Sequence, residues 1–195
     1  MVLTWFVGFN GLTAGCTTVR YLREASVIDV GATVHEAPKA EDPMQAVLTV
    51  YGAARLAAMS EARNVTFPIG VAHILLGGML LVASAMAMAG RPGARSLALQ
   101  AILATAVLAL IEYALTQRVR AAAIEALVRA DVLRAALPPD QALLFDQRLW
   151  WWVDRIRLVL FDLGTLGLAA FALTRRRTMA YFDAVAHSSE SAEEP

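Results

Sequence analysis

The chain has 195 residues, of which 58% are hydrophobic, and its 17 basic and 17 acidic side chains cancel to a net charge of zero. A neutral chain lacks the bulk positive charge that attracts nucleic acid, so we expect no nucleic-acid partner. The single cysteine, Cys16, excludes an intrachain disulfide, a redox pair of cysteines and a cysteine-cluster metal site. The high apolar fraction favours an integral membrane protein over a water-soluble domain.

Residues 1–19 hold no charged side chain and predict a first membrane span. Gly11 and Gly15 stand four positions apart, a spacing that lets the backbone of a second helix approach closely. Glycine is also simply common in membrane helices, and we weight this plainer explanation somewhat more. Two other interpretations, a secretory signal peptide and a lipidated Cys16, are disfavoured because the segment lacks a basic start.

The next stretch is polar as far as residue 43 and predicts an irregular connector, in which only residues 27–34 are apolar. Asp42 and Pro43 then form a typical helix start, an N-cap residue followed by proline at the first helical position. Apolar residues at helical spacing carry the predicted helix to about residue 63. We expect this amphipathic helix, residues 42–63, to lie outside the membrane.

Two long apolar runs follow, at residues 67–89 and 96–116, joined by a short turn that contains Pro92 and Gly93. Each run holds about 20 residues, enough to cross a hydrocarbon core of roughly 30 Å. The sequence therefore predicts a transmembrane helical hairpin. Small residues recur at regular spacing on both helices and favour close packing. They are Gly70 and Gly77 on the first helix, and Ala101, Thr105 and Ala109 on the second.

Residues 117–137 continue without a helix breaker, and apolar side chains recur there every three or four residues, which is a heptad seam. A second seam of ten apolar positions runs to Leu173 and predicts one continuous helix over 140–174. We expect its first part, residues 140–157, to pair with residues 117–137. Its second part, residues 158–174, is the predicted fourth span.

Trp150, Trp151 and Trp152 stand just before the fourth span, where tryptophan typically anchors a helix in the headgroup layer. Consecutive helical residues point about 100° apart, so the three cannot share one face. We assign Trp152 to the seam and expect the other two to face lipid or another subunit. Residues 1–185 should form a single domain, followed by a disordered acidic tail at residues 186–195.

Three ionisable side chains fall inside the predicted spans: His73, Glu112 and Asp162. Counted from the span ends, each lies within roughly 10 Å of the same membrane boundary. An intramembrane proton or cation site would explain them, since such acids usually face a cavity or a partner. We favour a structural explanation, in which acids near the interface pair with arginines. Arg155, seven residues before Asp162 on one helix face, is such a partner.

The sequence contains no nucleophile–base arrangement, no cofactor motif and no second histidine at ligand spacing, so we expect no enzyme activity, cofactor or metal. The predicted fold class is all-α: a multi-pass integral membrane helical bundle of four spans, with amphipathic helical extensions on one side. Basic residues near the span ends slightly favour the cytoplasm for these extensions.

The leading functional hypothesis is association within the lipid bilayer, as a homo-oligomer or with a membrane protein partner, in an accessory, scaffolding or sensing role. The rival hypothesis is a small proton- or cation-coupled transporter or channel that uses the intramembrane acids.

Overall fold

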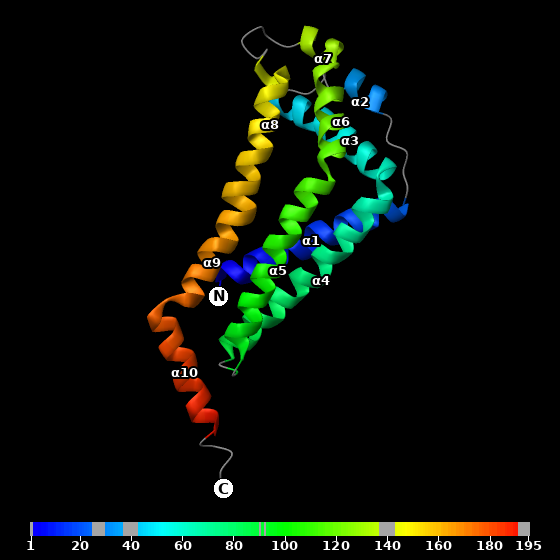
Figure 1. The fold of residues 1–195 in the computed structure, drawn as a ribbon. Helices are drawn as coiled ribbons and strands as arrows, with labels where there is room; N and C mark the ends of the chain where they lie inside the picture. Colours follow the sequence, from blue (N-terminus) through cyan, green and yellow to red (C-terminus); the bar gives the residue numbers. More distant parts are fainter. Residues whose placement is uncertain are drawn as a thin grey trace. The chain divides into compact units, whose positions relative to one another are not determined.

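The computed structural model describes residues 2–24, 30–36, 43–89, 91, 93–136 and 143–190. Over these ranges the secondary structure is helical and contains no strand. Four of the helices are long and apolar enough to cross a membrane: Val2–Arg23, Arg63–Met88, Ala94–Leu115 and Gln147–Thr174 (Figure 1). The all-α prediction and the number of helices of spanning length are confirmed.

The chain forms two compact units, each built from separate stretches of sequence. The apolar unit comprises residues 1–19, 69–112 and 158–195, and the polar unit comprises residues 20–68 and 113–157. Each point at which the chain passes between the units lies within about four residues of a predicted span end. The expectation of one domain for residues 1–185 stays a prediction.

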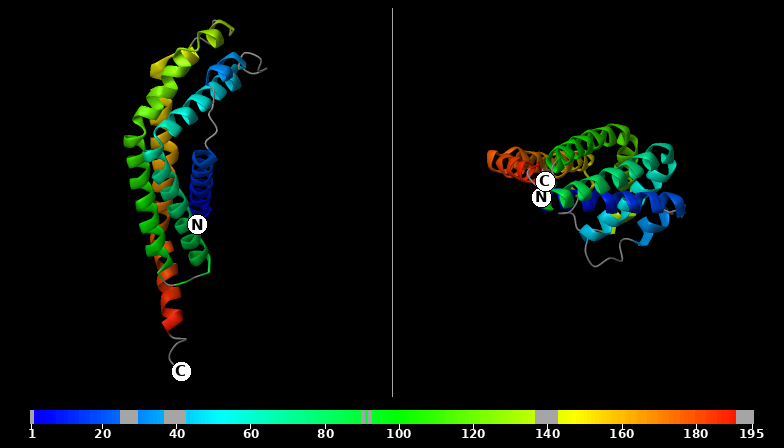
Figure 2. Two further views of the ribbon diagram at one scale, coloured as in Figure 1. Left: turned by 90° about the vertical axis from the view of Figure 1, so that its right-hand side faces the viewer. Right: turned by 90° about the horizontal axis from the view of Figure 1, so that it is seen from below.

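Five helices contribute to the apolar unit: α1 (Val2–Glu24), α4 (Arg63–Met88), α5 (Ala94–Leu115), α9 (Gly164–Thr174) and α10 (Arg176–Glu190). Helices α4 and α5 run antiparallel as the predicted hairpin (Figure 2). Their turn contains Gly93 with φ of +78°, a backbone conformation that residues with a Cβ rarely adopt.

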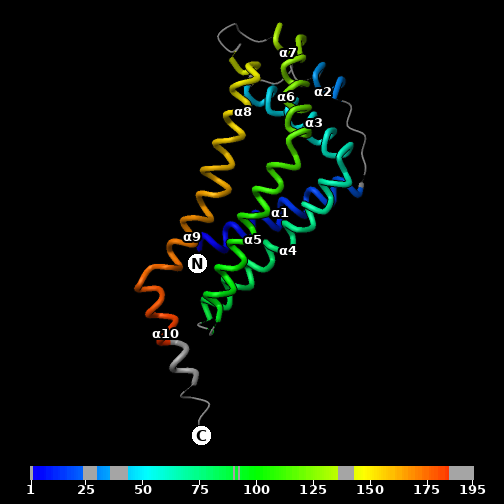
Figure 3. The backbone as a smooth tube through the Cα atoms, in the orientation of Figure 1, coloured from blue at the N-terminus to red at the C-terminus, as the bar shows by residue number. Residues whose placement is uncertain are grey.

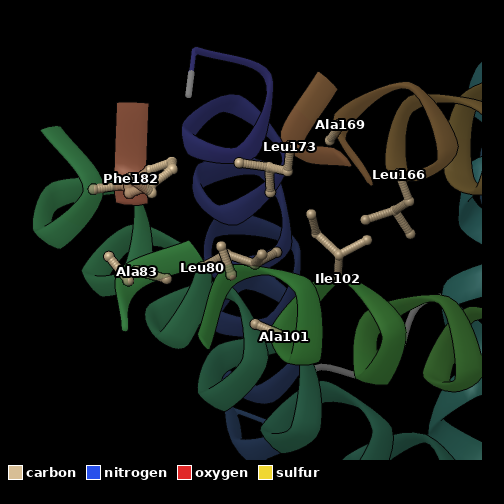
Figure 4. Packing of buried hydrophobic residues seen from close by; sticks show 11 residues of the cluster. Leu80, Ala83, Ala101, Ile102, Leu166, Ala169, Leu173 and Phe182 are labelled. Atoms are coloured by element: carbon tan, nitrogen blue, oxygen red, sulfur yellow. The ribbon is translucent and has the colours of Figure 1, made fainter. Parts of the chain in front are cut away.

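One hydrophobic cluster fills the apolar unit. In Figure 4, Ile102 of α5 lies between Leu166 and Leu173 of α9, while alanines let the helix backbones come close. The Arg95 guanidinium donates a hydrogen bond to the Leu173 carbonyl oxygen at 3.1 Å and so satisfies a free carbonyl at the end of α9. The buried members are Leu80, Ala83, Ala87, Ala94, Ala98, Ala101, Ile102, Leu166, Ala169, Leu173 and Phe182.

The polar unit is built around α3 (Pro43–Glu61) and α6 (Gln117–Val128), which pack against each other more extensively than any other pair of helices. Helix α8 (Gln147–Ile156) also contacts α6, and the short helix α2 (Val30–Glu36) packs on α3 and on α7 (Asp131–Ala136). The main partner of residues 117–137 is therefore α3 rather than residues 140–157. The apolar residues of α3 and α6 face each other, so their burial decides the pairing.

The boundary between α3 and α4 falls at Ala62, whereas the sequence predicted a break or kink at Phe67 and Pro68. Pro68 lies inside α4, in its second turn, where proline removes one backbone N–H donor without ending the helix. The hydroxyl of Thr66 donates to the carbonyl oxygens of Met59 at 2.9 Å and Ala62 at 3.1 Å. These hydrogen bonds provide a donor for the two carbonyl oxygens at the point where the helix is interrupted.

The predicted continuous helix over 140–174 is confirmed over Gln147–Thr174 but differs in its start and in its winding. Residues 137–142 lie outside the described ranges. Helix α8 begins at Gln147, because the Asp146 carboxylate caps it by accepting a hydrogen bond from the Arg148 backbone N–H at 2.9 Å. A π-helical segment, Arg157–Leu163, then joins α8 to α9, and the backbone of Figure 3 runs on from α8 to α9 as one coil. A π-helix turns less per residue than an α-helix, so a heptad pattern does not keep its face through it.

Three further boundaries differ from the sequence prediction. Helix α2 lies within the stretch expected to be irregular, and residues 117–137 break into α6 and α7 at Arg129–Ala130. Helix α10 extends through residues 186–190, which were expected to be disordered, because no glycine or proline interrupts Arg176–Glu190. Residues 191–195 of the expected tail lie outside the described ranges.

Candidate functional site

Glycines bring α1 and α4 into close contact in the apolar unit. A Cβ atom placed on Gly15 would lie 2.6 Å from the Gly70 carbonyl oxygen, and one placed on Gly77 would lie 2.6 Å from the Leu12 backbone nitrogen. A Cβ on Gly11 would reach ordinary contact, 3.7 Å from the Gly77 Cα. The structure thus brings the four predicted packing glycines into one contact, which the plainer explanation from composition does not account for.

Two features of this contact escaped the sequence analysis. Gly8 continues the glycine spacing of α1, and its Cβ would lie 2.9 Å from the Gly77 carbonyl oxygen. Thr4 and Ser84 are both buried, and their hydroxyl oxygens lie 2.9 Å apart in a hydrogen bond between the helices. The spacing of Gly8, Gly11 and Gly15 was a signal that could have indicated a longer seam.

The small-residue stripe of α5 is divided. Ala101 is fully buried in the hydrophobic cluster, whereas Thr105 and Ala109 are half-buried. The Thr105 hydroxyl donates to the Ala101 carbonyl oxygen of its own helix at 2.7 Å. Only the start of the stripe therefore lies in a tightly packed interior.

The side chains of His73 and Glu112 are hydrogen-bonded to each other between α4 and α5. The His73 Nε2 and Glu112 Oε2 atoms lie 2.8 Å apart, and the two side chains are 22% and 27% exposed. Sequence analysis placed these residues at a similar depth, and the structure joins their side chains directly. The structure gives Glu112 a titratable partner.

The other two residues of the predicted polar cluster are placed differently. Asp162 belongs to the apolar unit and lies half-buried in the π-helical segment. Arg155 belongs to the polar unit, and its guanidinium lies 5.7 Å from the centre of the Trp152 ring. Because the π-helical segment begins between Arg155 and Asp162, their spacing of seven residues no longer places them on one face.

A second charged pair, which the sequence analysis missed, lies inside the polar unit. The Arg120 Nε and Asp154 Oδ2 atoms are 3.7 Å apart, and the two side chains are only 9% and 11% exposed. Both atoms are buried without a hydrogen bond. The signal was present in α6, because Arg120 stands four residues before Ile124 and seven before Leu127 and so shares their buried face.

The Arg120 guanidinium is held mainly by neutral groups. It donates to the Thr116 hydroxyl at 2.9 Å and to the Tyr113 carbonyl oxygen, and it lies 3.9 Å from the centre of the Tyr113 ring. Burial lowers the pKa of Arg120, and the negative charge of Asp154 opposes that shift. The Asp154 carboxylate is therefore the charge that balances a cation removed from water.

Tyr51 and Trp150 stack next to this pair, with ring centres 4.6 Å apart. Trp150 is buried and donates its indole N–H to the Leu144 carbonyl oxygen at 2.7 Å. Burial, and then the negative charge of Asp154, raise the pKa of Tyr51 above its usual value of about 10. The Tyr51 phenol is therefore neutral at physiological pH.

The tryptophans face the opposite way to the prediction. Trp150 is 8% exposed and Trp151 half-buried, whereas Trp152 is 60% exposed. The reason is the hydrogen bond and ring stacking of Trp150, which turn the predicted seam outward. That seam leaves an apolar stripe on α8, which we call the α8 stripe and which consists of Leu149, Trp152, Val153 and Ile156, each at least 40% exposed.

Among the residues that the structure describes, no group of three histidine, cysteine or acidic side chains could hold a metal ion. The chain matches no protein family model, no curated protein and no solved structure. The features that bear on function are therefore the α8 stripe, the His73–Glu112 pair and the glycine contact of α1 with α4.

Proposed function

We propose that this chain is a multi-pass membrane protein that acts by associating with another membrane-bound chain, as an accessory subunit or scaffold. Support for the membrane comes from the apolar unit, whose four passes (residues 2–19, 69–88, 94–112 and 158–174) each hold about 17–20 residues, close to the thickness of a hydrocarbon core. Their ionisable side chains, other than the weakly acidic thiol of Cys16, are only His73, Arg95, Glu112 and Asp162.

Support for association comes from the α8 stripe, the observation that carries the proposal. Its residues recur at positions i, i+3, i+4 and i+7, the pattern by which one helix docks on another. Trp152 is the most exposed of them. The stripe belongs to the polar unit, in which α3 and α6 bury apolar residues against each other. Association with another chain would cover the apolar surface that α8 leaves exposed.

The proposal also places the polar unit in the cytoplasm, which the basic residues near the span ends favour slightly. Arg20 and Arg23 end the first apolar pass, and Arg118, Arg155 and Arg157 flank the others within the polar unit. Basic residues close to span ends are retained on the cytoplasmic side.

Site-specific crosslinking in native membranes tests the association. Cys16 is the only cysteine, so a Cys16→Ser background leaves one introduced thiol to report. Val153→Cys places that thiol on the α8 stripe with little change in volume. Ala122→Cys is the matched control, because Ala122 is an exposed residue of α6 outside the stripe.

We expect the Val153→Cys chain to form a crosslinked species with a membrane protein and the Ala122→Cys chain to remain single. The mass of the product identifies the partner as a second copy or as another chain. A Val153→Cys chain that stays single, together with a monomer in native mass spectrometry from detergent, would refute the proposal.

A further inference from the structure

The His73–Glu112 pair differs in chemistry from the Arg120–Asp154 and Arg129–Glu125 pairs. Arg120 and Arg129 carry a charge at every physiological pH, so their pairs with Asp154 and Glu125 do not switch. An imidazole gains and loses its proton between about pH 5 and 8. The net charge of a carboxylate–histidine pair can therefore change within the pH range of a cell.

We propose that His73 and Glu112 form a proton-binding site in the apolar unit, independent of the association proposed above. In the state with one bound proton, the imidazolium N–H donates to the carboxylate across the 2.8 Å contact and the pair is neutral. Uptake of a second proton from hydronium forms an O–H bond on Glu112 and returns water. Release of the first proton leaves a neutral imidazole beside the carboxylate.

The position of the pair gives protons a short route. Glu112 is the last residue of its pass through the apolar unit, and α5 ends three residues later at Leu115, a rise of about 5 Å. The two side chains keep about a quarter of their surface open. The pair therefore lies near one end of the span, and a proton that enters from that end need not cross the whole unit.

The surroundings make the two groups titrate as one site. Net charge is costly in an apolar environment, so the state with one shared proton is favoured over the states with none or two. The other ionisable side chains of the four passes are Cys16 on α1, Arg95 on α5 and Asp162 in the π-helical segment. Arg95 is bound to the Leu173 carbonyl oxygen.

Infrared titration of the full chain in phosphatidylcholine vesicles tests the site. The carboxyl step is followed by the C=O band of protonated Glu112, identified by its loss in Glu112→Gln. The imidazole step is followed by the ring band that His73→Gln removes, which separates it from His35 and His187.

We expect each substitution to displace the step of the other residue by at least about one pH unit, a tenfold change in proton affinity. The two displacements should be equal within about 0.3 unit, because coupling between two sites is reciprocal. Asp183→Asn, which removes an exposed acid of α10, should displace neither step.

Displacements below about 0.3 pH unit, or displacements that differ between the two directions, would show that the pair is only a structural contact. If Glu112→Gln loses its helical circular dichroism, the His73→Gln chain decides alone. Movement of the Glu112 step by one pH unit then supports the site, and an unmoved step overturns it.

Discussion

Replacement of Gly77 by alanine should pull α1 away from α4. The added Cβ would lie 2.6 Å from the Leu12 backbone nitrogen and 2.7 Å from the Gly8 carbonyl oxygen, whereas ordinary contacts begin at 3.4 Å. Backbone atoms cannot rotate aside, so α1 must move by about 0.8 Å. A gap of that size forfeits about a quarter to a half of the dispersion energy across the contact.

We expect Gly77→Ala to lower the free energy of unfolding by about 1–3 kcal/mol, the usual cost of overpacking. Gly78→Ala is the matched control, because its added Cβ would have no heavy atom within 4 Å. The higher helix propensity of alanine should leave that variant neutral or more stable by up to about 1 kcal/mol.

Unfolding of the full chain in mixed detergent–SDS micelles, followed by circular dichroism, compares the two variants directly. The reasoning is refuted if their unfolding free energies agree to within about 0.5 kcal/mol, the scatter of substitutions that touch nothing.

Three further predictions concern the polar unit. Asp154→Leu should lower the free energy of unfolding by about 3 kcal/mol, because it leaves Arg120 buried without a counter-charge. Adding Arg120→Met should recover most of this loss. Equal losses in the single and double variants would contradict the prediction. Because the folded-state pKa of Tyr51 is raised, its contribution to stability is present below about pH 10 and is lost as the pH rises further. Tyr51→Phe should therefore reduce the fall of the melting temperature at alkaline pH, as thermal melts would show. Trp150→Phe should lower the melting temperature by removing a buried hydrogen bond, whereas Trp152→Phe should leave it unchanged.

The positions of the helices of spanning length could be predicted from sequence because hydrophobic runs are local signals. The runs at 67–89 and 96–116 correspond to Arg63–Met88 and Ala94–Leu115, within a few residues. The depth of His73 and Glu112 could be estimated in the same way, because rise per residue is fixed in a helix.

Which face of α8 points into the protein could not be predicted, because it depends on contacts with residues distant in the sequence. Heptad counting placed Trp152 inside, whereas the stacking of Trp150 on Tyr51 leaves Leu149, Trp152 and Ile156 of the predicted seam exposed. The π-helical segment has no signature in composition. The expected alignment of Arg155 with Asp162 assumed a regular α-helix between them, whereas part of that stretch is π-helical.

The dependence of α1 on α4 has a consequence for how the protein is made. Helix α1 is the least apolar of the four candidate spans, and α4 begins about forty residues after α1 ends. On the proposed topology, a chain emerging from the ribosome presents α1 to the translocation machinery well before the glycines that receive it exist. Stable residence of α1 in the bilayer is then completed only when Gly70 and Gly77 have been synthesised, so the first span becomes secure no earlier than the second.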